Sequence, residues 1–270
     1  MGIRKSLIEK QMIDRLGEER QNSQYCSMKI IKYNSYNDVV VQFQDKYRAI
    51  VHTTYKHFSK GAVKNPYAPS VYEVGMIGNK YITSIDRKHI REYLCWSGVL
   101  ERCYSDLYKN KHHTYNDVIC CDEWLLYENF YEWLHSQENF DKWLNGDRWA
   151  IDKDILFKRN KMYSPETCCL VPQNVNGIFV KCNTERRVLP IGVSYHKATQ
   201  KYRAEISKYN NGKYVSEHIG LYNTIEEAFQ AYKKVKEFYI KQVAREEYVK
   251  GNITKICYDA MMNYEVEIDD

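Results

Sequence analysis

Hydrophobic and polar positions along the chain follow different periods in different segments. Over residues 3–20 apolar side chains recur every three or four positions, which predicts an amphipathic helix. From residue 28 the period falls to two, which is typical of strands with one buried face. The strands are expected at 29–33, 38–43 and 47–54, and we expect them to form a small sheet or barrel within about 28–85.

The middle of the chain returns to the helical period. Apolar and aromatic residues mark one face of a helix over 90–104, and a second aromatic helix follows near 130–134. We expect these apolar and aromatic side chains to form a core rather than a ligand site. They are Tyr93, Trp96, Leu100, Tyr104, Phe130, Trp133 and Leu134.

A strand pattern over 149–156 comes next, followed by a turn at 163–166 and a short strand over 168–171. Pro172 then suits the opening of a helix that carries Asn176. The segment therefore predicts two short strands followed by a helix.

Two further strands, over 201–207 and 214–221, precede a long helix over 225–247. Thr224 is a candidate N-cap, with Glu227 at the position of a capping box. Because strand side chains alternate, burial of Tyr202, Ala204 and Ile206 would place their neighbours on the outer face.

Within residues 186–250, a stretch of about 60 residues resembles the DNA-binding domain of ethylene-response-factor-like proteins. The matching segments are Gly192-Val193, Tyr202-Arg203-Ala204-Glu205-Ile206, Ile219-Gly220-Leu221-Tyr222, Thr224-Ile225-Glu226-Glu227-Ala228 and Ala231-Tyr232. The resemblance implies a three-stranded antiparallel sheet packed on one helix, with the sheet in the DNA major groove. Tyr202 stands where the family usually has tryptophan. The residues expected to contact DNA are Tyr195, His196, Lys197, Lys201 and Arg203.

Residues 90–180 resemble phage-type HNH endonucleases more loosely. The resemblance lies in Trp96, Arg102-Cys103-Tyr104 and Cys121-Asp122-Glu123-Trp124, and in the strand, turn and helix pattern that follows. It implies a ββα unit around one divalent metal, Mg²⁺ or Mn²⁺, with Asp152 and Asn176 as metal ligands. Asn160 or Thr167 corresponds to a further asparagine of the family.

Lys153 occupies the position where the family usually has its general base, histidine. Histidine suits that task because its pKa lies near neutral pH, whereas lysine begins at about 10.4. Lys153 is therefore either a strongly desolvated base or a cation that holds the scissile phosphate. His112 and His113 are an alternative source of the base, and Asp154 is either a second carboxylate near the metal or a salt-bridge partner.

Charge along the chain is unevenly distributed, although the net charge is only +5. Basic residues predominate over 1–90 and 186–250, and acidic ones over 91–185 and 251–270. This arrangement suits a polyanion-binding protein with a metal-dependent centre, and random patchiness is the alternative. Lys56, Lys60 and Lys64 are expected either to contact the DNA backbone or to lie in a solvated loop.

The 9 cysteines form no C-x-x-C pair, which argues against a zinc ribbon or a disulfide framework and favours reduced, mostly buried thiols. No stretch approaches the roughly 20 apolar residues of a membrane-spanning helix. The N-terminal residues also lack the apolar core of a signal peptide. We expect a cytoplasmic protein, of a bacterial host cell if the chain is of phage origin.

Together these patterns predict an α+β chain of four segments. They are an N-terminal helix with a small β-domain (1–89), an HNH-like nuclease domain (90–185), a DNA-binding domain (186–250) and an acidic C-terminal tail (251–270). The leading hypothesis is an endonuclease that hydrolyses duplex DNA. One alternative is a DNA-binding or regulatory protein in which the nuclease fold survives without efficient chemistry, and another is a fold adapted to bind and inhibit a host protein.

Overall fold

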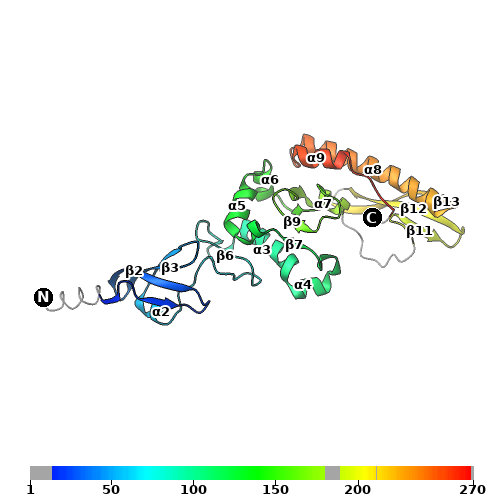
Figure 1. Ribbon diagram of the computed structural model, residues 1–270. Coiled ribbons are helices and arrows are strands. Elements are labelled where there is room, and N and C mark those ends of the chain that lie inside the picture. Colours follow the sequence, from blue (N-terminus) through cyan, green and yellow to red (C-terminus); the bar gives the residue numbers. More distant parts are fainter. Residues whose placement is uncertain (1–13, 180–188, 211, 269–270) are drawn as a thin grey trace. The chain divides into compact units, whose positions relative to one another are not determined.

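The computed structural model describes residues 14–179, 189–210 and 212–268, and it has a mixed α+β architecture (Figure 1). The α+β class expected from the sequence is thereby confirmed. The chain divides into two compact units, Met1–Glu132 and Trp133–Asp270, and each unit is described by itself.

The first unit begins with a four-stranded antiparallel sheet in the order β1-β2-β3-β4. Its strands are β1 (Glu19–Gln21), β2 (Ser27–Ser35), β3 (Asp38–Phe43) and β4 (Ile50–Thr53). The three strands expected from the period of two are confirmed. The helix expected over 3–20 lies largely outside the described residues, and its last two residues belong to β1 instead.

A short helix, α2 (Tyr55–Ser59), follows the sheet, and Phe58 contributes its fully buried ring to the core. That core also contains Met28, Val39 and Phe43, all 0% exposed. Alternating apolar residues of β2 and β3 therefore face the same side as the helix, which is why the period of two is visible in the sequence.

The rest of the first unit is mostly helical. Trp96 and Leu100 of α3 are fully buried, and the Trp96 indole donates a 2.7 Å hydrogen bond to the Trp124 carbonyl. The aromatic face of the helix is therefore core, as expected. The elements are β5 (Ser84–Ile85), β6 (Lys88–His89), α3 (Arg91–Tyr104), α4 (Asp106–Lys111), β7 (Ile119–Cys120), α5 (Tyr127–His135) and two 3₁₀ turns (His113–Tyr115, Asp122–Leu125).

A buried carboxylate links the loop after the β-sheet to α5. Glu128 Oε1 accepts hydrogen bonds of 2.7 Å from the backbone N–H groups of both Asn79 and Lys80, and the Tyr67 hydroxyl donates to the same carboxylate. Gly78, at φ +77°, lies so close that a Cβ there would overlap Glu128. The loop is held by a charge-assisted network rather than by apolar packing alone.

The second unit contains the two strands and the helix expected over 149–176. Strand β8 (Trp149–Asp152) pairs antiparallel with β10 (Cys169–Pro172), and α7 (Gln173–Phe179) follows β10 directly. Helix α6 (Phe140–Asn145) precedes this hairpin, and β9 (Met162–Tyr163) lies between its strands in sequence. Pro172 is the last residue of β10, so the helix begins one residue later than the proline.

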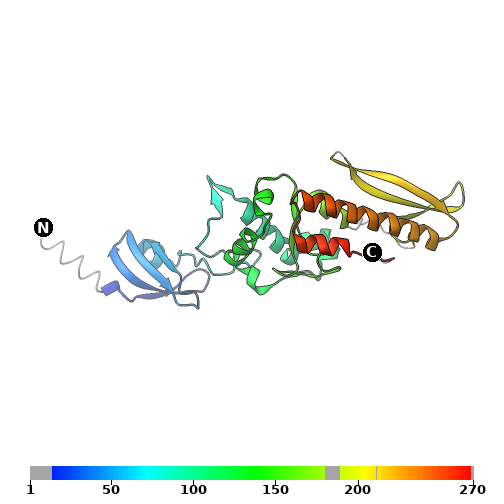
Figure 2. The same cartoon turned by 90° about the horizontal axis from the view of Figure 1, so that it is seen from above.

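The two strands expected over 201–207 and 214–221 are also present. Strands β11 (Val193–His196), β12 (Lys201–Asn210) and β13 (Lys213–Tyr222) form an antiparallel sheet in sequence order. Helix α8 (Ile225–Val249) lies along one face of this sheet (Figure 2). The capping box of Thr224 and Glu227 is confirmed, with both of its hydrogen bonds formed.

One hydrophobic core joins these parts of the second unit. It contains Val171 of β10, Val175 of α7, Ile206 of β12 and Ile240 of α8. It continues into α9 (Lys255–Met262), a helix within residues 251–270, which were expected to form an acidic tail. The core therefore crosses both expected boundaries, at positions 185 and 250.

None of the helices in the described part of the chain combines the length and hydropathy that crossing a bilayer requires.

The shared core makes a prediction about the last segment. Met261 of α9 is 0% exposed and Ile256 of the same helix is 70% exposed. Met261→Ala should lower the free energy of unfolding by about 2–5 kcal/mol, because it leaves a cavity in the core. Ile256→Ala is the matched control and should change it by less than about 0.5 kcal/mol. Urea denaturation followed by tryptophan fluorescence measures both, and equal effects would contradict the shared core.

Candidate functional site

The candidate site begins at the end of β8. Asp152, the last residue of that strand, is 8% exposed and pairs in register with Cys169 of β10. Its Oδ1 accepts hydrogen bonds from the backbone N–H groups of Asp154 (2.7 Å) and Ile155 (2.8 Å). The side chain thus stabilises the turn by which the chain leaves the strand, as short acidic side chains commonly do.

Burial sets the electrostatics of this carboxyl group. It raises the pKa of Asp152 to about 6, although the two backbone N–H groups favour the charged form. Within the described residues the second oxygen, Oδ2, has no hydrogen-bond partner. Asp152 therefore has one oxygen committed to the fold and one available to a ligand.

Lys153 is also buried, at 7% exposed, which is unusual for a lysine. Its Nζ donates to Asp154 Oδ2 at 2.7 Å and to the Asn160 carbonyl at 2.6 Å. Asp154 thus has the salt-bridge role that was one of the two expected for it. These two hydrogen bonds fix the Lys153 side chain in the loop that follows β8.

Asn160 closes the loop that Lys153 begins. Its amide nitrogen donates to the carbonyls of Lys153 (2.9 Å) and Met162 (2.5 Å), and its amide oxygen accepts from the Met162 N–H. Thr167, the other residue considered for this position, donates to the Met162 carbonyl at 2.8 Å. Both side chains shape the loop, and Asn160 makes the larger number of contacts with its backbone.

Asn176 lies on α7, which packs against both β8 and β10. It is half-buried, and the described part of the chain gives its side chain no hydrogen bond. Helix α7 and the end of β8 thus belong to the same small ββα unit. That Asp152 and Asn176 share one metal ion stays a prediction.

The chemistry of this donor set suits magnesium better than zinc. Among the described residues no group of three or more His, Cys, Asp or Glu side chains could hold a metal ion. Mg²⁺ needs fewer protein ligands, because it is usually bound by one or two carboxylates and completes its shell with waters and substrate phosphates. The free oxygen of Asp152 and the amide oxygen of Asn176 fit that pattern.

The expected DNA-binding residues lie mainly on the sheet face opposite α8. Arg203 pairs in register with Ser194 of β11, and its Nε lies 3.3 Å from Ser194 Oγ and 3.4 Å from Glu205 Oε2. Both contacts use Nε, so within the described residues the two terminal nitrogens remain available. The guanidinium group is therefore oriented and partly exposed, at 39% for the side chain.

The register corrects one detail of this surface. Tyr195 pairs directly with Tyr202, and the two rings meet edge to face at 5.5 Å. Since directly paired residues point to the same side of a sheet, Tyr195 lies on the α8 side, not on the outer face. His196 and Lys201 form the next pair on the outer face, and Lys197 is exposed just after β11.

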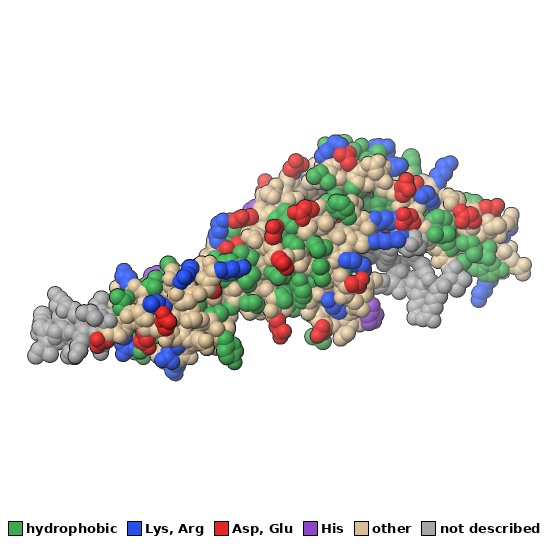
Figure 3. Space-filling model, in the orientation of Figure 1, with side chains coloured by type: hydrophobic (Ala, Val, Ile, Leu, Met, Phe, Trp, Pro, Cys, Tyr) green, Lys and Arg blue, Asp and Glu red, His purple; other side chains and the backbone are tan. Residues whose placement is uncertain are grey.

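The basic residues expected in the first unit are exposed. Lys56 lies on α2, and Lys60 and Lys64 lie just after it, with no ion pair among the described residues. His112 and His113 lie at the end of α4, in the first unit, and Asp152 lies in the second. Figure 3 shows basic and acidic side chains interspersed on the face it presents, so charge alone does not single out a binding surface.

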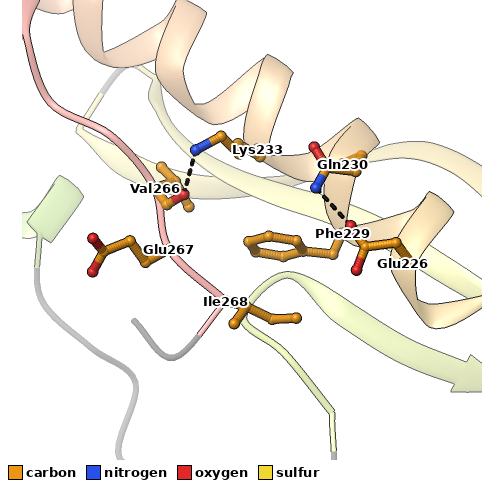
Figure 4. Close-up of a pocket in the computed structure, with 7 residues that line it drawn as sticks. All are labelled: Glu226, Phe229, Gln230, Lys233, Val266, Glu267 and Ile268. Carbon is orange, nitrogen blue, oxygen red and sulfur yellow. Dashed lines mark hydrogen bonds between the residues drawn. The ribbon is translucent and has the colours of Figure 1, made fainter.

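A shallow groove of about 420 Å³ lies between α8 and residues 266–268 (Figure 4). The ring of Phe229 and the side chain of Ile268 line it, and Lys233 bridges across to the Val266 carbonyl at 2.7 Å. This bond holds the C-terminal segment against α8. The groove contains none of the predicted site residues.

Comparison of the chain with known protein families, with curated proteins and with solved structures finds no significant match in any of the three.

The two roles of Asp152 can be separated by mutation. Asp152→Ala removes the acceptor of two backbone N–H groups and should lower the free energy of unfolding by about 1–3 kcal/mol. Asp152→Asn keeps an oxygen acceptor and removes only the buried charge, so it should be at least as stable as the parent at pH 8. Thermal denaturation in the presence of EDTA measures both. Equal losses in the two variants would mean that the charge itself holds the turn.

Proposed function

We propose that this protein binds duplex DNA through the sheet β11–β13 and hydrolyses a phosphodiester bond at the ββα unit, with Mg²⁺ or Mn²⁺. The observation that carries the proposal is the position of Asp152. A carboxylate with one free oxygen ends the first strand of an antiparallel pair, and a helix bearing an amide oxygen follows the second strand. This is the arrangement that the resemblance to HNH endonucleases implies.

DNA binding is supported by the outer face of the sheet. Arg203 is held by Ser194 and Glu205 through Nε, which leaves its two terminal nitrogens to face a ligand. Such a fork fits two phosphate oxygens or the O6 and N7 atoms of guanine. Lys201 and His196 extend the same face toward the end of β11.

A bound metal ion would supply a coordinated water and neutralise charge on the phosphate as the bond breaks. Asp152 Oδ2 and the Asn176 amide would hold it. Lys153 lies beside Asp152, and its ammonium group fits the role of a cation near the scissile phosphate rather than that of a base. Its bonds to Asp154 and Asn160 keep that charge in a fixed position.

A second candidate function is DNA binding without efficient hydrolysis. It is favoured by the same contacts of Lys153, because they commit the side chain at the usual general-base position to the structure of the loop. The two candidates share the DNA-binding sheet and differ only in the chemistry of the ββα unit.

The binding step is tested by salt and by Arg203. Duplex affinity, measured by fluorescence anisotropy, should fall about tenfold to a hundredfold between about 50 and about 200 mM salt as counterions are released. Arg203→Ala should weaken binding by about 1–3 kcal/mol. Arg245→Ala removes an exposed arginine of α8 and is the control, with little effect expected. Affinity that responds neither to salt nor to Arg203 would rule out this surface.

The chemical step is tested with supercoiled plasmid, Mg²⁺ or Mn²⁺, and EDTA as the metal-free control. The parent chain should nick or cut only with metal, and Asp152→Asn should lose this activity while keeping its duplex affinity, because it loses a charged ligand but not its turn. Lys153→His should raise cleavage if position 153 is the place of the base, with Lys153→Gln as the uncharged control. Binding without any metal-dependent cleavage by the parent chain would favour the second candidate.

A further inference from the structure

The sheet extends beyond its shortest strand. Strand β11 pairs only with Lys201–Ala204 of β12, whereas β12 and β13 remain paired as far as Asn210 and Lys213. The far half of this two-stranded ribbon therefore lacks a third strand. Side-chain contacts with the neighbouring helices must hold it in place.

The side chains of Tyr239 and Tyr214 hold the far half of the ribbon against the helices. The Tyr209 backbone N–H donates a 2.9 Å hydrogen bond to the hydroxyl of Tyr239, a buried residue of α8. Opposite Tyr209 on β13 is Tyr214, whose ring lies 5.1 Å from the Tyr209 ring. The Tyr214 side chain is 48% exposed, and partial burial together with the two neighbouring tyrosines raises the pKa of its hydroxyl.

The Tyr214 hydroxyl fits against α7 at Gly177. A Cβ on Gly177 would overlap that hydroxyl, so the absence of a side chain on this glycine makes the contact possible. Gly177 does not have a positive φ, so its backbone does not require glycine. What matters at this position is the space that the missing side chain leaves. Lys236 of α8 donates to the Ile178 carbonyl at 2.9 Å and holds the same end of α7.

We propose that Tyr214, seated at Gly177, is a positioning residue that sets the register between DNA bound on the sheet and the ββα unit. The inference rests on the proposed function. Helix α7 carries Asn176, the residue next to Gly177, so the ribbon is fixed directly to the helix that bears a candidate metal ligand. A duplex bound by β12 and β13 is thereby presented to Asp152 and Asn176 at one position along its backbone.

Gly177→Ala tests this with little risk to the fold. Alanine is a better helix former than glycine by about 1 kcal/mol, so α7 should persist while its new methyl group displaces Tyr214. Tyr214→Ala removes the contact from the other side. Asn174→Ala, on the same helix, is the matched control.

The readout is the position of contact on DNA. A photoreactive benzophenone amino acid replaces Gln173, an exposed residue at the start of α7, and crosslinks an end-labelled duplex selected for binding to the parent chain, without metal. The parent and Asn174→Ala backgrounds should crosslink at one or two adjacent nucleotides. Gly177→Ala and Tyr214→Ala should spread the crosslinks over several nucleotides, with duplex affinity changed less than about twofold.

The outcomes separate the two proposals. Narrow crosslinks in both the Gly177→Ala and Tyr214→Ala backgrounds, or scattered ones in the parent, would overturn the positioning role even if the protein cleaves DNA. Narrow parent crosslinks that spread in these variants support it even if metal brings no cleavage, which would defeat only the hydrolytic part of the proposed function. A parent chain that binds no duplex would overturn both.

Discussion

The packing of α8 is the constraint on which the second unit depends. One face of this helix buries Ala228, Tyr232 and Ile240 in a core shared with the sheet, the ββα unit and α9. Because close-packed interiors transmit displacements instead of absorbing them, the part of the sheet that carries Val193, Ala204 and Ile206 cannot move relative to the ββα unit without opening that core, whereas the far half of the β12–β13 ribbon lies outside it. The outer face of the sheet near β11 and the candidate site at Asp152 are therefore held in one body.

Within that body, Asp152 and Lys153 are placed where their charges are costly. Each charge that is taken out of water must be offset by hydrogen bonds or an opposite charge. Asp152 has two backbone N–H groups, and Lys153 has Asp154 and the Asn160 carbonyl. The loop from 153 to 162 is thus built around two buried ionisable groups, which is more than a simple connection between strands requires. That arrangement is consistent with a functional site.

Much of the fold follows from local pattern in the sequence. The strands over 29–33 and 38–43, the aromatic helix near residue 96 and the Thr224 capping box all depend on neighbours within a few residues, so one sequence suffices to predict them. The face on which Tyr195 lies depends on its register with β12, which alternation along a single strand does not determine. Helix α9 has no counterpart in the prediction, because the acidic charge of residues 251–270 comes mostly from positions after the helix and conceals two fully buried residues, Cys257 and Met261.

The candidate site likewise has residues that were predicted from the sequence and contacts that were not. Asp152 and Asn176 are predicted from the resemblance to HNH endonucleases, whereas the contacts of Lys153 join residues seven positions apart through a loop of no regular pattern. Tyr214 and Gly177 are farther apart still, and neither belongs to a motif. Their contact exists because β13 returns past α7, a consequence of tertiary packing. A close approach of this kind explains why a glycine stands at position 177, which its backbone angles do not explain.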